Sequence, residues 1–286
     1  MGSNPTVSSI KSESEATTRF FSGTTNWRRL LALVAAVYVV FALAIFFGAE
    51  RLIFIPHDPG YPPGPGILMI PTVDHESIAA ISHQITDAPF TVIYFHGNEE
   101  DLSDVGDRLA EFKQLGLSTF AIDYRGYGRS AGTPTEENTY HDADAAYSYV
   151  TNGLKVPPTK IIVLGRSLGG AVAIDLAARR PVAGLVIESS FTSAYRVAVP
   201  FPILPFDQFE SIDKIDRVKC PIAVMHGTAD DVVPFSQGKE LFAAAHQPKI
   251  SLWVDGATHA TLLARAGHSY ADTIRSLLDM IAAQRR

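Results

Sequence analysis

The segment from Lys160 to Arg180 limits most strongly what this chain can fold into. A strand-like run, KIIVL, leads into the glycine-rich turn GRSLGG, and an apolar run typical of a helix, AVAIDLAARR, follows at once. Glycines are needed in such a turn because a Cβ would collide with the adjoining strand or helix. The turn holds the Ser167 hydroxyl clear of the backbone, at a helix start whose amide N–H groups can stabilise an oxyanion. The segment predicts a nucleophilic serine on a strand-to-helix turn.

Strand-like and helix-like segments alternate from residue 77 to the carboxyl end. The strand-like runs are 77–83, 91–96, 117–122, 160–164, 183–187, 220–225 and 249–254, and the helical segments are 102–114, 136–151, 168–179, 236–245 and 265–284. This repetition predicts an α/β fold with a mainly parallel sheet, helices on both faces and no internal repeat. Residues 194–219 are apolar and proline-rich and break the alternation, so we expect a short cap there, beside a binding cleft.

A serine hydroxyl is a weak nucleophile, so the hypothesis requires a histidine base and an acid that orients it, in the chain order Ser, Asp, His. His259 follows the last predicted strand and precedes the final helix. Asp230 and Asp231 both follow the strand PIAVM and reach the edge of the sheet predicted for Ser167. One of the two is the expected acid, and the other is expected to cap the loop.

An oxyanion hole needs two backbone donors near the nucleophile. Leu168 supplies one N–H, and the motif YFHGN at the end of an early strand can supply the N–H of Asn98. Glu188, which follows the strand AGLVI, is an alternative acid that we expect to be structural. Arg166 lies next to the nucleophile, and we expect it to tie loops together rather than touch substrate.

The amino-terminal part of the chain predicts a tail and a membrane anchor. Residues 1–29 are expected to form a disordered tail, and residues 30–48 run without a charged side chain. A helix of that length, at about 1.5 Å per residue, nearly matches a hydrocarbon core of about 30 Å. A buried core helix and a cleaved signal peptide are the alternatives to this uncleaved transmembrane anchor. The hydrolase domain is expected at 49–286.

Charges on either side of the span predict its orientation. Lys11, Arg19, Arg28 and Arg29 precede it, whereas only Arg51 follows closely. Since positive flanks stay in the cytoplasm, we expect a cytoplasmic amino end and an exoplasmic or periplasmic domain.

Composition and motif spacing argue against several classes of partner. The net charge of -6 and the lack of a basic stripe argue against nucleic-acid binding. None of the nine histidines has the spacing of metal ligands, and the single cysteine excludes an internal disulfide. The segment GYGRSA at 126–131 matches a dinucleotide-binding pattern but does not open a helix, so it predicts no such site. We expect no metal and no cofactor.

Further motifs carry a family resemblance. They are RLIFIP at 51–56, YFHGN, DYRGYGRS, GRSLGG, ESSFTS, FDQFESIDKIDRVKCP and HGTADDVVP, followed by the late histidine. From about Glu50 to its end the chain resembles small membrane-anchored α/β-hydrolases, a group that includes protein depalmitoylases and is related to serine aminopeptidase-like hydrolases. The resemblance implies the α/β-hydrolase fold and a triad of Ser167, Asp230 and His259. It therefore favours Asp230 over Asp231.

Together these features predict a serine hydrolase that cleaves an ester or thioester through an acyl-enzyme. Anchoring near a bilayer and the apolar cap at 198–209 favour an acyl-chain or lipid-like substrate. A serine peptidase with the same triad and a non-catalytic membrane scaffold are the alternatives.

Overall fold

The computed structural model describes residues 24–199 and 201–284, which divide into two compact units between Ala49 and Glu50. Helix α1 (Thr24–Ile53) includes a span, Asn26–Ile53, that is long and apolar enough to cross a membrane. It exceeds the predicted span, 30–48, at both ends, because charged residues next to an apolar run can continue the same helix. Residues 1–23 of the predicted tail lie outside the described residues.

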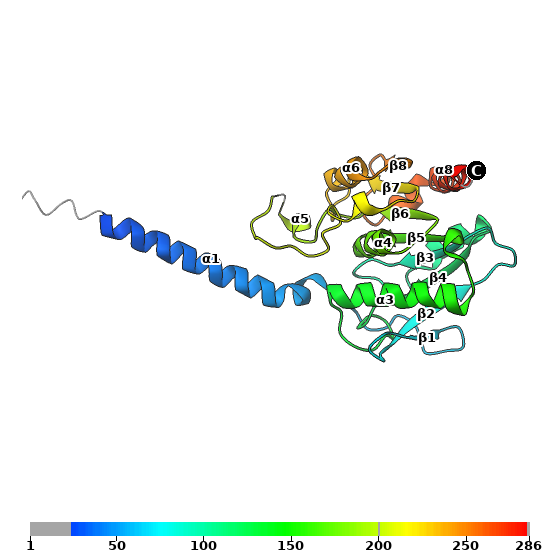
Figure 1. Ribbon diagram of the computed structural model, residues 1–286, viewed down its shortest axis with the longest axis horizontal. Helices are drawn as coiled ribbons and strands as arrows, with labels where there is room; N and C mark the ends of the chain where they lie inside the picture. The colour runs from blue at the N-terminus through cyan, green and yellow to red at the C-terminus, as the bar shows by residue number, and fades with distance from the viewer. Residues whose placement is uncertain (1–23, 200, 285–286) are drawn as a thin grey trace, which may run out of the picture. The chain divides into compact units, whose positions relative to one another are not determined.

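The second unit is built on one eight-stranded sheet in the order β1-β2-β4-β3-β5-β6-β7-β8. The six strands β4, β3, β5, β6, β7 and β8 run parallel to one another. At one edge of the sheet, β2 runs antiparallel to both of its neighbours, β1 and β4. The strands are β1 (Leu68–Pro71), β2 (Ser77–His83), β3 (Thr91–Phe95), β4 (Ser118–Ile122), β5 (Ile161–Arg166), β6 (Gly184–Glu188), β7 (Ile222–Gly227) and β8 (Lys249–Val254). Figure 1 shows this order from bottom to top. The predicted parallel sheet is confirmed.

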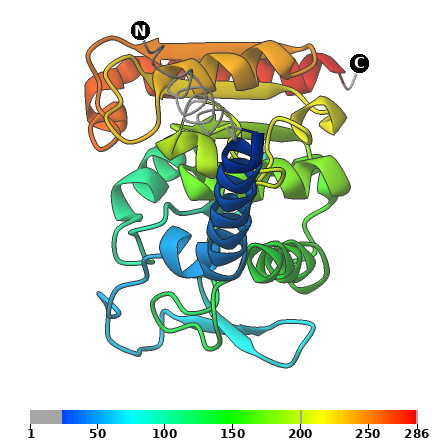
Figure 2. The ribbon, with the colours of Figure 1, turned by 90° about the vertical axis from the view of Figure 1, so that its left-hand side faces the viewer.

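Helices cover both faces of the sheet. They are α2 (Gly106–Gln114), α3 (Glu136–Ser148), α4 (Leu168–Arg179), α5 (Tyr195–Ala198), α6 (Phe235–Ala244), α7 (Leu262–Ala266) and α8 (His268–Gln284). One core cluster contains side chains of α3, α4 and α6, and a second contains side chains of α2, α7 and α8. The orange and red carboxyl-terminal elements lie at the β8 edge, away from the cyan strands β1 and β2 (Figure 2).

Two helices differ from the sequence-based prediction. The helix expected at 265–284 is two helices, because Gly267 takes a left-handed conformation with φ of 52° and ends α7. The helix expected at 102–114 begins only at Gly106, after a loop. Strand β1 lies in the Pro- and Gly-rich segment 51–71, whose sequence predicts a linker and entry strands. In the described residues of the predicted cap, 194–199 and 201–219, the chain forms α5, a 3₁₀ turn at Ile215–Arg217 and otherwise irregular structure.

A buried ion pair supports the carboxyl end of β6, next to the strand that carries the nucleophile. Glu188 is fully buried, and Arg108 of α2 binds its carboxylate at 2.5 Å. The Tyr270 hydroxyl of α8 donates to the second carboxylate oxygen at 3.1 Å. Burial opposes the charge of Arg108, but the nearby Glu188 carboxylate outweighs this effect and raises the pKa of Arg108. Glu188 therefore holds α2 and α8 against the sheet, as expected for a structural residue.

Replacing Arg108 should destabilise the domain strongly. Arg108→Leu leaves the buried Glu188 carboxylate without its charge partner, and we expect a loss of about 3–5 kcal/mol in the free energy of unfolding. The matched control is Arg180→Leu, since Arg180 is 47% exposed where it pairs with Asp144, and it should lose less than about 1 kcal/mol. Chemical denaturation in detergent measures both, and equal small losses would contradict the structural role.

Candidate active site

Ser167 lies between β5 and α4 in a strained backbone conformation. Its φ is 53° and its ψ is -119°, values that cost a non-glycine residue roughly 1–3 kcal/mol. Three hydrogen bonds hold it there: its N–H donates to the Glu188 carbonyl at 2.8 Å, and its carbonyl accepts from the Gly170 N–H at 2.9 Å and the Ser190 hydroxyl at 2.8 Å. The serine stands at the first position before α4, as predicted.

The glycines around Ser167 are required by close backbone packing. A Cβ on Gly165 would overlap the carbonyl group of Gly169, and a Cβ on Gly169 would overlap the carbonyl of Phe95 in β3. The second contact brings α4 directly against the strand that precedes the YFHGN loop. The spacing of GRSLGG thus reflects two backbone contacts on either side of the serine.

His259 binds the carboxylate of Asp230. The ring Nδ1 lies 2.9 Å from Oδ2 and 3.1 Å from Oδ1 of Asp230, whose side chain is fully buried. Because an ionised carboxylate only accepts hydrogen bonds, Nδ1 carries the proton of this bond and leaves Nε2 as the basic nitrogen. Asp231 is exposed and accepts from the His259 backbone N–H at 3.2 Å instead. The structure therefore brings Asp230, and not Asp231, to the imidazole ring.

Hydrogen bonds keep Asp230 ionised. Oδ1 also accepts the backbone N–H groups of Val232 at 3.0 Å and Val233 at 2.8 Å, and His226 Nε2 lies 3.3 Å from Oδ2. Burial raises the pKa of Asp230, but the hydrogen bonds from His226 and His259 outweigh that effect and hold the pKa well below its usual range. The carboxylate is therefore charged at neutral pH, as an orienting acid must be.

No hydrogen bond joins the Ser167 hydroxyl to the His259 ring within residues 24–199 and 201–284. Both are 9% exposed, and Ser167 Oγ has no hydrogen-bond partner within the described part of the chain. The neighbouring Arg166 connects their loops, since its Nη2 donates to the His259 carbonyl at 3.0 Å. Hydroxyl–imidazole contacts in unliganded enzymes are often long and shorten when substrate binds.

Arg166 links the turn, the His259 loop and the loop that follows β3. Its Nη1 binds Glu100 at 2.8 Å, and the second oxygen of Glu100 accepts the Gly97 N–H at 2.6 Å. Burial raises the pKa of Glu100, but the charges of Arg166 and Arg108 outweigh it and lower that pKa below its usual value. Arg166 ties loops together, as expected. The sequence does not predict the ion pair of Glu100 with Arg166, because no local pattern shows which cation a carboxylate in a loop will bind.

The backbone N–H of Asn98, in the loop after β3, is one of the two donors predicted for the oxyanion hole. Within residues 24–199 and 201–284, no hydrogen bond occupies the backbone N–H of Asn98 or of Leu168, the two donors predicted for an oxyanion. The Asn98 side chain is fully engaged: its amide donates to the Ile53 carbonyl, and its oxygen accepts from the Ile55 N–H at 3.2 Å and from the Tyr127 hydroxyl. The segment directly after α1 thus fixes the loop that carries the Asn98 N–H.

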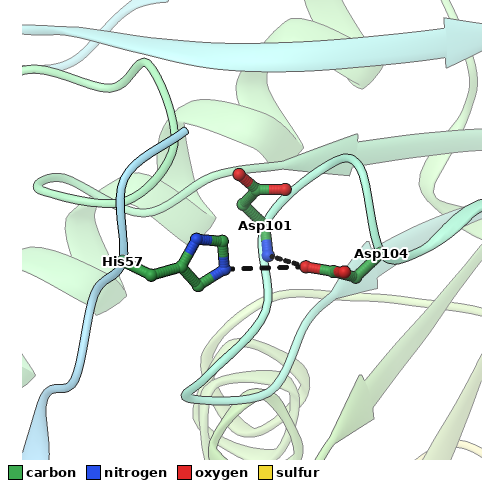
Figure 3. A group of neighbouring side chains, drawn as sticks. All are labelled: His57, Asp101 and Asp104. Carbon is green, nitrogen blue, oxygen red and sulfur yellow. Dashed lines mark hydrogen bonds and ion pairs between the residues drawn. The ribbon is translucent and has the colours of Figure 1, made fainter. Parts of the chain in front are cut away.

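His57, Asp101 and Asp104 form a separate cluster of side chains (Figure 3), with potential ligand atoms within 4.8 Å of one another. Its carboxylates already accept backbone hydrogen bonds, at 2.7 Å from the Gly60 N–H to Asp101 and at 3.0 Å from the Asp101 N–H to Asp104. His57 Nε2 lies 3.6 Å from Asp104, and the bond of His57 to the Asp58 carbonyl, with nearby carboxylates, raises its pKa. A metal ligand must be the deprotonated ring, so this arrangement fits an ion-paired loop better than a metal site.

Comparison with known proteins gives several relatives. Residues 87–205 match the family described as serine aminopeptidase, S33. An α/β-hydrolase domain-containing protein, aho-3 of Caenorhabditis elegans, is 38% identical over 202 residues, which cover 70% of this chain and 60% of that protein. The human α/β-hydrolase domain-containing protein 17B is 38% identical over 60% of this chain and 61% of its own length. The chain thus spans less than two thirds of these two relatives.

A longer match and two solved structures complete the comparison. An uncharacterised protein of Mycobacterium tuberculosis is 34% identical over 263 residues, 87% of this chain and 92% of that protein. The esterase Pf2001 of Pyrococcus furiosus superposes with a TM-score of 0.66 at 19% identity, over 78% of this chain and 98% of its own. Est1E of Butyrivibrio proteoclasticus, solved with ferulic acid, gives a TM-score of 0.61 at 18% identity, over 75% and 99%. These structures share the fold.

Proposed function

Since this chain belongs to the α/β-hydrolase family, we propose that it is a serine hydrolase that cleaves an ester or thioester with Ser167, His259 and Asp230. The observation that carries the proposal is the buried pair of His259 and Asp230, whose loop is connected through Arg166 to the strained turn of Ser167. A histidine with a purely structural role would not need a buried, ionised carboxylate at Nδ1. Nor would it need a basic Nε2 at the edge of the sheet that carries Ser167 with its positive φ.

The proposed reaction is an acyl transfer in two halves. Ser167 Oγ attacks the carbonyl carbon while its proton passes to His259 Nε2, and Asp230 stabilises the resulting imidazolium. The N–H groups of Asn98 and Leu168 donate to the oxyanion, and His259 returns the proton to the leaving alcohol or thiol. Water, deprotonated by His259, then attacks the carbonyl carbon of the acyl-enzyme. His259 returns this proton to Ser167 Oγ as the bond between Oγ and the acyl carbon breaks and the acid leaves, so no cofactor is required.

An acyl chain or lipid-like ester is the proposed substrate class. Helix α1 is long and apolar enough to anchor the enzyme in a bilayer, and the cap exposes large apolar side chains, Phe201 at 61% and Ile203 at 39%. A membrane anchor and exposed apolar side chains in the cap favour a substrate with a long hydrocarbon chain. Resemblance to depalmitoylase-like hydrolases agrees with this class.

Hydrolysis of p-nitrophenyl esters of graded chain length tests the reaction. We expect turnover by the full chain in detergent to increase with acyl length, and Ser167→Ala to lower kcat at least about 10³-fold and to abolish fluorophosphonate labelling. The exposed Ser269 provides the control, since Ser269→Ala should keep full activity. Equal labelling of Ser167→Ala and the unchanged protein would refute the nucleophile, and faster cleavage of amino-acid p-nitroanilides than of esters would favour the peptidase.

The charge distribution around α1 supports a cytoplasmic amino end and an exoplasmic domain. A cysteine at the exposed Asn152, in a chain with Cys220→Ser, tests this orientation. We expect a membrane-impermeant maleimide to label Asn152→Cys in intact cells. Labelling that appears only after permeabilisation would reverse the orientation.

A further inference from the structure

Residues 201–206, FPILPF, form an exposed apolar loop that the proposed reaction does not require; we call it the cap loop. Phe201, Pro202, Ile203 and Pro205 are exposed, and Leu204 and Phe206 are half-buried. The sequence carries no charge from residue 197 to 206. A large apolar surface without charges in a water-facing loop is unfavourable unless another apolar phase covers it.

Hydrogen bonds join the two ends of the chain at the base of the cap loop. The Ala194 N–H donates to the Gln208 carbonyl at 2.8 Å across the base. Asp207 accepts from the Ser193 hydroxyl at 2.6 Å and from the Tyr195 N–H at 2.9 Å. The nearest cation on the other side, Arg196, pairs with Glu240 at 3.4 Å. Arg196 is thus paired, and Phe201 and Ile203 of the cap loop line a cavity of about 320 Å³ together with Tyr195 of the base.

The chain that leaves α1 is attached to this base. Phe54, the first residue after α1, is 5% exposed, and its ring packs on that of Phe209 with centroids 5.9 Å apart. Phe209 is fully buried and lies three residues after the cap loop. The Phe54 backbone N–H continues the helix by donating to the Glu50 carbonyl at 3.0 Å.

Chain geometry then limits how far the cap loop can lie from the membrane. The charge-free run of α1 ends at Ala49, and about five further residues at about 1.5 Å each bring the chain to Phe54, roughly 7–8 Å beyond the hydrocarbon edge. The headgroup layer of a bilayer extends about 5–8 Å from that edge. The base of the cap loop is therefore held close to the headgroups, within reach of a loop of six residues.

We propose that the cap loop is a membrane-docking surface, and that Phe201 and Ile203 enter the interfacial layer of the bilayer that holds α1. Aromatic and aliphatic side chains are favourable at that depth, and the absence of charge from 197 to 206 avoids the cost of desolvating one. The inference rests on the proposed membrane anchoring and is independent of the catalytic assignment. It would place the cap where acyl chains are concentrated.

Depth-dependent fluorescence quenching tests the docking. The full chain with Cys220→Ser is reconstituted in phosphatidylcholine vesicles, with one cysteine labelled by an environment-sensitive fluorophore at Phe201→Cys, Asn152→Cys or Val37→Cys. Asn152 precedes β5, at the opposite end of that strand from Ser167, and Val37 lies in the middle of α1. Phospholipids spin-labelled at a shallow acyl position should remove about half or more of the fluorescence at position 201 and leave position 152 unchanged.

Each other outcome overturns the proposal in a different way. Quenching at position 37 by a deep spin label, without quenching at 201, would show an anchored protein whose cap loop stays in water. Absence of quenching at 37 would refute the anchoring itself. A change in the fluorescence of the label at position 201 that grows with protein concentration, in vesicles without spin label, would assign the cap loop to self-association instead.

Discussion

The left-handed backbone of Ser167 is the constraint on which the rest of the site depends. A serine in this conformation is unstable by itself, so its neighbours must hold it in place. The Glu188 carbonyl, the Ser190 hydroxyl and the two backbone contacts of Gly165 and Gly169 do so. Glu188 is in turn fixed by its buried pair with Arg108. The carboxyl end of β6 and its ion pair with α2 thus stabilise the conformation that exposes the hydroxyl.

Arg166 extends this order to the other loops of the site. Its guanidinium reaches the His259 carbonyl on one side and Glu100 on the other, and Glu100 holds the Gly97 N–H. Asn98 next to it binds the chain that leaves α1. The hydroxyl, the imidazole and the Asn98 N–H therefore sit on loops joined by one arginine. Such preorganised donors stabilise charge in a transition state without having to rearrange.

Local patterns predicted the parallel sheet and the positions of Ser167, His259 and the Asn98 loop, because each follows a strand whose apolar run is easily recognised. They could not choose between Asp230 and Asp231, since neighbouring residues share a loop and differ only in the direction of their side chains. The resemblance made that choice. The pairs of Arg166 with Glu100 and of Asn98 with Ile53 join residues far apart in the chain, so no local pattern contains them. Gly267 splits the last helix because one glycine within a helical period can either be tolerated or end the helix.

The proposed triad depends on Asp230 as the carboxylate that orients His259, whereas its neighbour Asp231 accepts a hydrogen bond from the His259 backbone N–H. Steady-state kinetics of Asp230→Asn and Asp231→Asn on a p-nitrophenyl ester test this most directly, since the two changes are chemically identical and one residue apart. Asp230→Asn should lower kcat by about 10⁴-fold, because the amide no longer fixes the tautomer of the imidazole, and Asp231→Asn by less than about tenfold. Equal losses, or a larger loss for Asp231→Asn, would contradict the proposed triad.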